Sequence, residues 1–425
     1  MAIKKQESLL LQNAREIQKQ TEELIKHLEQ RGIDEPNFSA SSPAPPADDE
    51  YDALAIKVVQ AAEDLILLTK GPLQWLRTFI CSQHDLGAWQ IALRFNLFTI
   101  VPLDRPISVS EVAATAKVDE DRIGHVLKLL ASQRCFQETE EDVFVHTALS
   151  AFVANNSEVR ATLAFQADEM FEAASLMATA VEKSPDSLDA AQSAFQLRFG
   201  MSPYKWYASN PERGSRFAAA MAGYGQMSRD PQGLRDRFPW AQLGDVTVVD
   251  VGGGSGHISL YLAQQFPRLN FIVQDYNTVM LEQGPKRPEF ESVQTRVSFM
   301  QYDFYQPQPI HDAGLFLLRQ VIHNYSDDKS VRIFKSFVPA LEKCAIGTGL
   351  LINDMILPNL NARAKAEEHG LRQIDMAMLG GYSAKQRSLK EFAKLLKTAD
   401  ERLKIVKVHG EGVLGLIEVQ LLRKV

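Results

Sequence analysis

The stretch VVDVGGGSGHISLYLAQQFP, Val248 to Pro267, decides the fold. Valines lead into Asp250, four glycines occupy the five positions from Gly252 to Gly256, and an amphipathic segment follows. A strand, a glycine turn and a helix in this order are typical of a ligand-binding turn in an α/β fold. Glycine is needed there because it tolerates positive φ angles and lets a ligand approach the backbone closely.

Segments typical of strands and of helices alternate from about residue 245 to the end. Strands are predicted at DVTVVDV, NFIVQDY, RVSFMQYDF, AGLFLLRQVI, GLLINDMIL, LKIVKVH and GLIEVQLL, and helices at SLYLAQQF, KSVRIFKSFVPAL and SLKEFAKLLKTA. Such alternation predicts an α/β fold, a Rossmann-like doubly wound sheet with helices on both faces. Ligands of these sheets bind at the carboxyl ends of the strands, near the point where strand order reverses.

The spacing of the glycine turn argues against two kinds of nucleotide site. The dinucleotide pattern G-x-G-x-x-G fails because His257 stands where its third glycine should be, and no Gly-Lys-Ser/Thr follows as in a phosphate loop. The turn also has no lysine to hold a phosphate. We therefore expect a small ligand without phosphates over Asp250, Gly252, Gly253 and Gly254.

Acidic residues end the next two predicted strands. Asp275 follows Gly256 by nineteen residues and could accept hydrogen bonds from ribose hydroxyls. Asp303 could accept from an adenine amino group, and Phe304 could stack on the ring. Each acid alone could be an ordinary strand-end residue or helix cap. Together, in this order and spacing, they favour an adenosine ligand.

The N-terminal half has a different pattern. Residues 1 to about 33 predict a helix, SASSPAPPADD (Ser39 to Asp49) predicts a linker, and a region from about Ile107 predicts helix, turn, helix and two short strands, which is a winged-helix pattern. A winged helix can bind DNA, but the segment from Asp104 to Asp142 contains nine acidic residues and only five basic ones. Because an acidic surface repels phosphates, we expect no nucleic-acid partner. A dimerisation or substrate-covering module fits better.

Length and patterning together predict four segments. They are an N-terminal helix and linker (1–50), a helical winged-helix dimerisation domain (51–160), a helical connection (161–235) and a ligand-binding domain (236–425). The 425 residues carry a net charge of −7, only three cysteines and no apolar run of membrane-spanning length. The histidines form no metal-ligand spacing. We expect a cytoplasmic protein with no metal and no membrane partner.

At these residues the chain resembles the class I S-adenosylmethionine-dependent O-methyltransferases of plant and fungal secondary metabolism. Beyond the glycine turn, the resemblance rests on LLRQVIHNYSDDKSVRIFKSFVPAL, on LLINDMILP and on SAKQRS. It covers roughly residues 55 to 423. It implies S-adenosyl-L-methionine as cofactor and an N-terminal domain that forms a homodimer.

The same resemblance assigns roles to single residues. It makes His323 the general base, with Asp354 orienting its ring, and puts Arg319 and Tyr325 at the cofactor. In SAKQRS the family usually has a glutamate where this chain has Gln386, which can hydrogen-bond but cannot stabilise an imidazolium by charge. Asn324 stands in place of the commoner aspartate.

Further residues are candidates for the substrate pocket. Phe217, Met221 and Tyr224 lie at helical spacing on one face, which suits either a flat wall for a ring-shaped substrate or core packing. Met376 and Asn324 complete this set, and core packing is an equal alternative for Met376. Beyond His323 in the sequence, we expect Asp327 and Asp328 to cap and charge the N-terminus of the helix KSVRIFKSF.

The sequence therefore predicts an O-methyltransferase that acts on a hydroxylated aromatic or polyketide-like metabolite. Some relatives of such folds hold the cofactor but catalyse a dehydration or a pericyclisation. Gln386 keeps that second hypothesis open, whereas the intact His323 favours methyl transfer. A DNA-binding regulator is the third hypothesis, and the acidic balance of the winged-helix region disfavours it.

Overall fold

The structure, a computed structural model, describes residues 8–186, 192–227, 230–409 and 415–423. The chain divides into two compact units. The first contains residues up to 172 together with 210–224 and 360–370, and the second contains 173–209, 225–359 and the chain from 371 onward. The four segments expected from the sequence follow other boundaries and stay a prediction.

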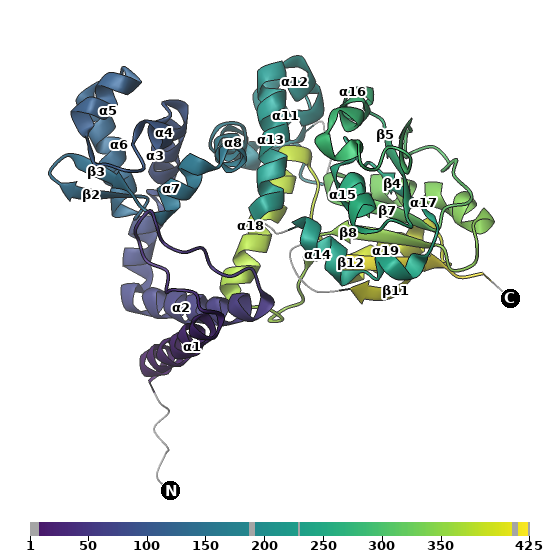
Figure 1. The fold of residues 1–425 in the computed structure, drawn as a ribbon, viewed down its shortest axis with the longest axis horizontal. Coiled ribbons are helices and arrows are strands. Elements are labelled where there is room, and N and C mark those ends of the chain that lie inside the picture. Colours follow the sequence, from purple (N-terminus) through teal and green to yellow (C-terminus); the bar gives the residue numbers. More distant parts are fainter. Residues whose placement is uncertain (1–7, 187–191, 228–229, 410–414, 424–425) are drawn as a thin grey trace, which may run out of the picture. The chain divides into compact units, whose positions relative to one another are not determined.

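The first unit is mainly helical (Figure 1). Its helices are α1 (Leu9–Arg31), α2 (Asp49–Phe79), α3 (Ser82–Arg94), α4 (Leu97–Ile100), α5 (Val109–Ala116), α6 (Glu120–Ser132), α7 (Ala148–Asn155), α8 (Ser157–Phe165), the π-helix η1 (Gln166–Met170), α9 (Phe171–Ala174), which runs into the second unit, and most of α13 (Pro211–Met227). Helix α2 bends at Gly71, whose φ of 63° lies outside the helical range, directly before Pro72.

A small antiparallel sheet accompanies α5 and α6. It has the order β1-β3-β2, with β1 (Ile107–Ser108), β2 (Phe136–Glu140) and β3 (Val143–His146). The sequence predicted only two of these strands. The short β1 forms because Ile107 and Ser108 pair with β3, and Ser108 then caps α5 in a reciprocal box with Glu111.

Small residues let α13 pack closely against α8 within the first unit. A Cβ added at Gly223 would lie 2.3 Å from Oγ1 of Thr162. The Thr162 hydroxyl donates to the carbonyl of Ala220 at 2.8 Å, across the two helices. The glycine is therefore required by the close approach of α8 to α13.

The second unit is built on a seven-stranded sheet of order β11-β12-β8-β7-β4-β5-β6. The strands are β4 (Thr247–Val251), β5 (Asn270–Asp275), β6 (Val297–Gln301), β7 (Leu315–Arg319), β8 (Gly349–Asp354), β11 (Leu403–His409) and β12 (Gly415–Leu421). The five strands from β8 to β6 are parallel, and β12 pairs antiparallel with both β8 and β11. Strand order reverses between β4 and β7, which creates the switch point.

Both faces of this sheet are covered, as the continuous apolar strands predict (Figure 1). In β7, Phe316 and Leu318 face a core shared with α17 (Asp327–Lys343) and α19 (Leu389–Ala399). Leu315 and Leu317 face the opposite core, which includes α14 (Asp230–Arg237) and α15 (His257–Gln265). The alternation of side chains along a strand divides these residues between the two faces.

The second unit has further elements besides the sheet and the helices named above. They are α10 (Met177–Lys183), α11 (Ala194–Phe199), α12 (Pro203–Ser209), α16 (Thr278–Gln283), most of α18 (Lys365–Tyr382), the two-residue strands β9 (Ile356–Leu357) and β10 (Arg387–Ser388), and the 3-10 turns η3 (Trp240–Leu243), η4 (Gly284–Lys286), η5 (Pro288–Phe290) and η6 (Ile322–Asn324). Over the part of the chain that is described, no helix is both long and apolar enough to cross a membrane.

Candidate active site

The glycine turn lies at the switch point of the sheet. It follows β4 directly, and β7, the neighbouring strand on the other side of the reversal, ends at Arg319. Gly252, Gly254 and Gly256 have φ angles of 76°, 58° and 74°. These are left-handed conformations that side chains with a Cβ rarely adopt, so the positions require glycine.

Close packing gives the turn a second reason for its glycines. A Cβ at Gly252 would lie 2.8 Å from Cγ2 of Val321, and one at Gly253 would lie 2.6 Å from Oδ2 of Asp250. The turn is therefore bare backbone at the end of the sheet, which suits a ligand that lies close over it.

Asp250 supports this turn from inside the protein. Its side chain is buried, and Oδ2 accepts a hydrogen bond of 2.7 Å from the Ser259 hydroxyl. Burial raises the pKa of the Asp250 carboxyl to about 6, with a smaller contribution from the charge of Asp275. The carboxyl is thus poorly solvated, and its role is to help fix the conformation of the turn.

Asp275 ends β5 beside the turn. Its Oδ2 accepts from the backbone N–H of Gly254 at 3.0 Å and its Oδ1 from the N–H of Asn277 at 2.8 Å. Burial raises the pKa of this carboxyl against those hydrogen bonds. A carboxylate has about four acceptor positions, so acceptor capacity remains for a hydroxyl donor of a ligand.

Asp303, Phe304 and Tyr325 form an adjoining group. Oδ1 of Asp303 accepts from the N–H of Tyr305 at 3.0 Å. The ring of Phe304 meets that of Tyr325 edge to face at 5.5 Å and that of Tyr305 at 5.0 Å. These aromatic faces provide an apolar surface that could receive a purine ring.

Arg319 and the residue after it complete the switch point. Burial lowers the pKa of the Arg319 guanidinium to about 10, against the opposing effect of the Asp354 carboxylate. Gln320 has a φ of 51°, a left-handed conformation that costs energy for a residue other than glycine. Such strained residues are frequent at functional sites. The N–H of Gln320 donates to the Asn353 carbonyl at 2.9 Å, which holds this turn onto β8.

His323 lies in η6, just beyond β7, and two predicted partners meet its ring. Nδ1 of His323 lies 3.1 Å from Oδ1 of Asp354 and 3.2 Å from Nε2 of Gln386. The His323 backbone N–H donates to the other carboxylate oxygen of Asp354 at 3.1 Å. Asp354 ends β8 and is fully buried. The carboxylate therefore holds the proton on Nδ1 and leaves Nε2 as the acceptor nitrogen.

The amide of Gln386 is also buried, and its Oε1 has no hydrogen-bond partner among the described residues. An amide turned by 180° has the same shape and would present Oε1 to the Nδ1–H of His323. His323 would then donate to two acceptors, one charged and one neutral. The backbone of Gln386 is also anchored, because its N–H donates to Oδ1 of Asp375 at 2.7 Å.

The predicted substrate residues divide between the two units. Phe217, Met221 and Tyr224 belong to the first unit, on α13. There Phe217 meets Phe165 edge to face at 5.5 Å, and Tyr224 bonds to the amide of Gln166. Met221 is 40% exposed. The group is thus partly packed and partly open.

Asn324 and Met376 belong to the second unit. The Asn324 amide donates to the carbonyl of Gln320 at 3.1 Å, which ties it into the turn. Met376, on α18, is 51% exposed, so it does not belong to the core of its unit.

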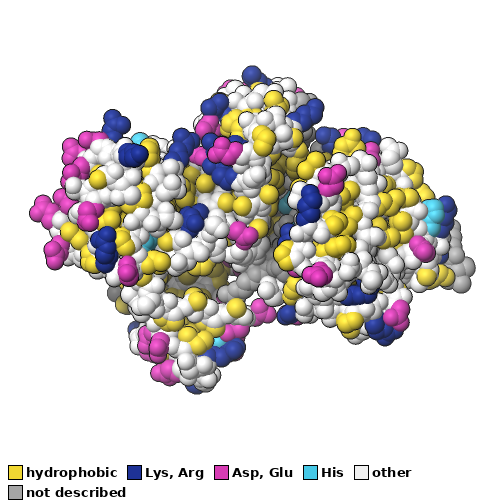
Figure 2. Space-filling model, turned by 45° about the horizontal axis from the view of Figure 1, so that its top comes forward, with side chains coloured by type: hydrophobic (Ala, Val, Ile, Leu, Met, Phe, Trp, Pro, Cys, Tyr) yellow, Lys and Arg dark blue, Asp and Glu magenta, His cyan; other side chains and the backbone are white. Residues whose placement is uncertain are grey.

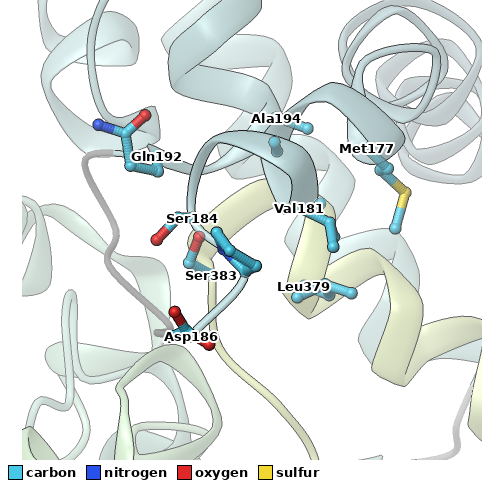
Figure 3. Close-up of a pocket in the computed structure, with 11 residues that line it drawn as sticks. Met177, Val181, Ser184, Asp186, Gln192, Ala194, Leu379 and Ser383 are labelled. Atoms are coloured by element: carbon cyan, nitrogen blue, oxygen red, sulfur yellow. The ribbon is translucent and has the colours of Figure 1, made fainter.

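The second unit also contains a cavity of about 280 Å³ (Figure 3). Met177 and Val181 of α10 and Leu379 of α18 supply apolar lining, and Ser184 and Ser383 supply hydroxyls. The cavity therefore has a mixed lining in which apolar side chains predominate. Ser383, which lines the cavity, precedes Gln386 by only three residues in the sequence.

Sequence reasoning missed two features of the site. Arg387, next to Gln386, is buried with its guanidinium directed at the turn of His323. The second is the contact between the rings of Tyr204 and Tyr382, whose centroids lie 5.6 Å apart. For Arg387, the only signal in the sequence was the R of SAKQRS, and the direction of its side chain depends on tertiary packing. Asp327 and Asp328 both lie in the first turn of α17 and place negative charge there as expected, but neither is the cap residue, which is Ser326. The Asp327 carboxylate also binds Arg387.

The residues present fit the expected cofactor. The turn is bare backbone without a lysine, and Asp275 keeps acceptor capacity for a ribose hydroxyl. Phe304 and Tyr325 offer ring faces, and Arg319 lies at the switch point. Across the described ranges, no group of three or more His, Cys, Asp or Glu side chains is placed to hold a metal ion.

Known proteins resemble this chain over most of its length. A family model for the O-methyltransferase domain matches residues 176–400. The O-methyltransferase sol2 of Alternaria solani is 43% identical over 408 residues, which are 96% of this chain and 94% of sol2. The O-methyltransferase bik3 of Gibberella fujikuroi is 30% identical over 404 residues, which are 93% of this chain and 88% of bik3.

Solved structures share the fold. OxaC superposes with a TM-score of 0.77 at 19% identity and covers 97% of this chain and 98% of its own. A pericyclic reaction enzyme superposes with a TM-score of 0.74 at 20% identity, over 89% of this chain and 95% of its own. At these identities the structures establish the fold alone. The family model and the sequence relatives go further, and they show that the chain belongs to the S-adenosylmethionine-dependent O-methyltransferase family.

Proposed function

We propose that this enzyme methylates a phenolic oxygen of a hydroxylated aromatic or polyketide-like metabolite and that His323 is the general base. The observation that carries the proposal is the pair of contacts from Asp354 to His323. One carboxylate oxygen faces Nδ1 at 3.1 Å and the other accepts the backbone N–H. They hold the ring in the tautomer whose Nε2 can accept a proton.

The need for a base follows from the acceptor. A phenol has a pKa of about 10, so little phenolate is present at neutral pH. Nε2 of His323 takes the phenolic proton as the oxygen becomes a nucleophile, and Asp354 stabilises the imidazolium that forms. When bound, S-adenosylmethionine supplies an electrophilic methyl group. Gln386 keeps the ring in place without adding charge.

Other residues bind and orient. Asp250, Gly252, Gly253 and Gly254 shape the turn under the cofactor, and Asp275 accepts from its ribose. Asp303, Phe304, Arg319 and Tyr325 surround the rest of the cofactor. We assign Phe217, Met221, Tyr224, Asn324 and Met376 to the acceptor, because most of them present apolar surface that suits a flat ring.

Gln386 favours a second candidate function. Where the family usually has a carboxylate, this chain has a neutral amide, which weakens the stabilisation of an imidazolium. Such a site could hold S-adenosylmethionine and instead catalyse a dehydration or a pericyclisation. The buried Asp354 beside His323 supports methyl transfer over this alternative.

We further propose a cytoplasmic homodimer that forms through a winged-helix domain and binds neither nucleic acid nor membrane. Acidic side chains gather at the outer edge of the region of α5, α6, β2 and β3, at the left of Figure 2. A polyanion gains nothing from such a surface. A gel shift with duplex DNA at physiological salt tests this point, and a retained complex would contradict it.

One experiment tests the main proposal. The protein is incubated with methyl-labelled S-adenosylmethionine and a metabolite extract from its source, and products are followed by mass spectrometry. We expect label in a product with wild type and with the control His311→Ala, which changes an exposed histidine outside the site. His323→Ala should give no labelled product and should keep its affinity for the cofactor. Full activity in His323→Ala would exclude the mechanism, and unlabelled conversion would support the second candidate.

A further inference from the structure

Arg387 is a buried arginine whose side chain points at the turn that carries His323. It is 1% exposed and begins β10, directly after Gln386. Nη1 donates to the carbonyl of Ile322 at 2.9 Å, and Nη2 donates to the carbonyl of Tyr325 at 2.7 Å. Those carbonyls lie on either side of residues 323 and 324. One guanidinium therefore binds both ends of the segment that holds the base.

The positive charge of Arg387 is paired with the carboxylate of Asp327, beside the same turn. Its Nε and Nη2 both donate to Oδ1 of Asp327, at 3.0 and 2.8 Å. Lys385 approaches the other carboxylate oxygen at 3.3 Å. Because Asp327 is the first residue of α17, the guanidinium also ties the turn to the start of that helix. A buried charge needs such a partner, so Asp327 is part of the same arrangement.

The fork of donors explains why arginine is needed here. The carbonyl of Ile322 already accepts from the N–H of Tyr325 at 3.1 Å, which closes η6. A planar guanidinium can reach two carbonyls and a carboxylate at once in fixed directions. A lysine has one flexible nitrogen, so it could satisfy only part of this set.

We propose that Arg387 is a positioning residue that fixes the turn of residues 322–325 and thereby the direction of the His323 ring. The proposal rests on the proposed function, in which His323 accepts the proton. Arg387 touches neither acceptor nor cofactor in this account. It acts through His323, because a shift of the turn would move Nδ1 away from Asp354 and Gln386.

The first test reads the His323 ring without any acceptor. The full-length protein is labelled with ¹⁵N in its nine histidines, and the ring signals are assigned with His323→Ala. We expect Arg387→Lys to shift or broaden the signals of His323 while those of His146 and His409, which bond elsewhere, stay in place. Unchanged His323 signals in Arg387→Lys would overturn the proposal.

Arg296→Lys is the matched control. Arg296 also binds backbone carbonyls in the second unit, donating to Ala263 at 2.7 Å and to Leu269 at 2.9 Å, and both of these residues lie outside η6. A shift of His323 signals equal to that in Arg387→Lys would mean a general loss of structure and would count against the proposal. If Arg387→Lys does not fold, Asp327→Asn, which weakens the same anchor, must shift the His323 signals in its place.

The second test is kinetic and uses the acceptor found in the labelling experiment. We expect kcat of Arg387→Lys to fall about tenfold or more, while the Kd for S-adenosylmethionine stays within about threefold. In a His323→Ala background the same substitution should have little further effect, because residues that act as a unit are not additive. An undiminished effect there would overturn the proposal. Changed His323 signals together with an active His323→Ala would instead refute only the proposed base.

Discussion

At the scale of single residues, the activity proposed here depends on what faces Nδ1 of His323. One partner, Asp354, carries charge and is fully buried, and the other, Gln386, is a neutral amide. Hydrogen bonds to a charged group are roughly twice as strong as those between neutral groups. With an amide in place of a carboxylate at residue 386, the contact with Nδ1 of His323 is kept. The imidazolium, however, lacks the stabilisation that a second negative charge would give.

Gln386→Glu tests this directly. The variant adds a second carboxylate at 3.2 Å from Nδ1, so we expect kcat to rise by up to about tenfold, equivalent to ~1.4 kcal/mol. Gln386→Leu, which removes the contact, should lower kcat. Steady-state kinetics with the identified acceptor give both values. A Gln386→Glu variant with lower kcat would indicate that the amide is selected for a reaction that does not form an imidazolium.

A second prediction concerns the buried Asp250. Its pKa is raised from 3.8 to about 6 because burial disfavours the charged form, so the folded protein binds this proton more tightly than the unfolded chain. The resulting stabilisation is complete below about pH 4 and is lost as pH rises through about 6. Asp250→Asn never carries the charge. Relative to wild type, its free energy of unfolding should increase by up to about 3 kcal/mol between pH 4 and pH 7.

Urea denaturation of the two proteins across that pH range measures the difference. The comparison between pH values removes any constant effect of the amide on the hydrogen bond from Ser259. Parallel curves for the two proteins would mean that Asp250 is not the group that titrates.

At the scale of elements, the π-helix η1 gathers the most concentrated charge in the first unit. Asp168 and Glu169 are both buried there. Arg94 of α3 and Arg213 and Arg216 of α13 bind Asp168 at 2.7, 2.9 and 2.6 Å. A π-turn widens the helix by one residue, and such turns are frequent at functional sites. Here it lets two consecutive carboxylates take part in joining α3, α8 and α13.

Asp168→Asn should therefore destabilise the first unit. The arginines hold the pKa of this carboxyl well below its usual range, although burial acts in the opposite direction. Removing the charge leaves three arginines with less compensation, and we expect a loss of about 2 kcal/mol, because the partly exposed Arg94 and Arg213 can rehydrate. The control Asp245→Asn breaks an exposed pair with Arg268 and should leave the unfolding midpoint nearly unchanged. Equal unfolding midpoints in the two variants would contradict the assigned role.

In the molecule as a whole, several large apolar side chains on α2 and directly after it are exposed, and we call them the α2 patch. Around the bend of α2, Ile66, Leu73, Phe79 and Ile80 are 51%, 76%, 57% and 62% exposed. Monomeric proteins rarely leave large apolar patches in water. A second copy of the chain is the occupant that the proposed homodimer requires.

Leu73→Glu places a charge in that patch and should convert the homodimer into monomers, because an interface core does not tolerate an unpaired carboxylate. Ile346→Glu is the control, since Ile346 is 87% exposed in the second unit, outside the patch. Light scattering after gel filtration gives the molar mass of each variant. A wild-type protein that already elutes as a monomer would refute the homodimer.

The alternation of strands and helices was visible in the sequence because it depends on local patterns. The predicted strand segments from DVTVVDV to GLIEVQLL are all present, and the glycine turn follows the first of them. The short β1 was missed because two residues carry no periodicity of their own. Asp327 was predicted as a cap because its spacing from the helix is right, but Ser326 is the cap residue, and the nearby guanidinium of Arg387 binds the Asp327 carboxylate.

The α/β class could be predicted from the sequence, because the alternation of strand and helix patterns is local, and the resemblance to the O-methyltransferases implied the cofactor. The resemblance also named Asp354 and Gln386 as partners of His323, but only the folded chain sets the distances between these groups. Asp354 lies 31 residues away and Gln386 lies 63, and their contacts depend on β8 ending beside the turn after β7 and on the parallel pairing of β9 with β10. Arg387 reaches the carbonyl of Ile322 across 65 residues for the same reason. Register and packing set such distances, and no local pattern encodes them.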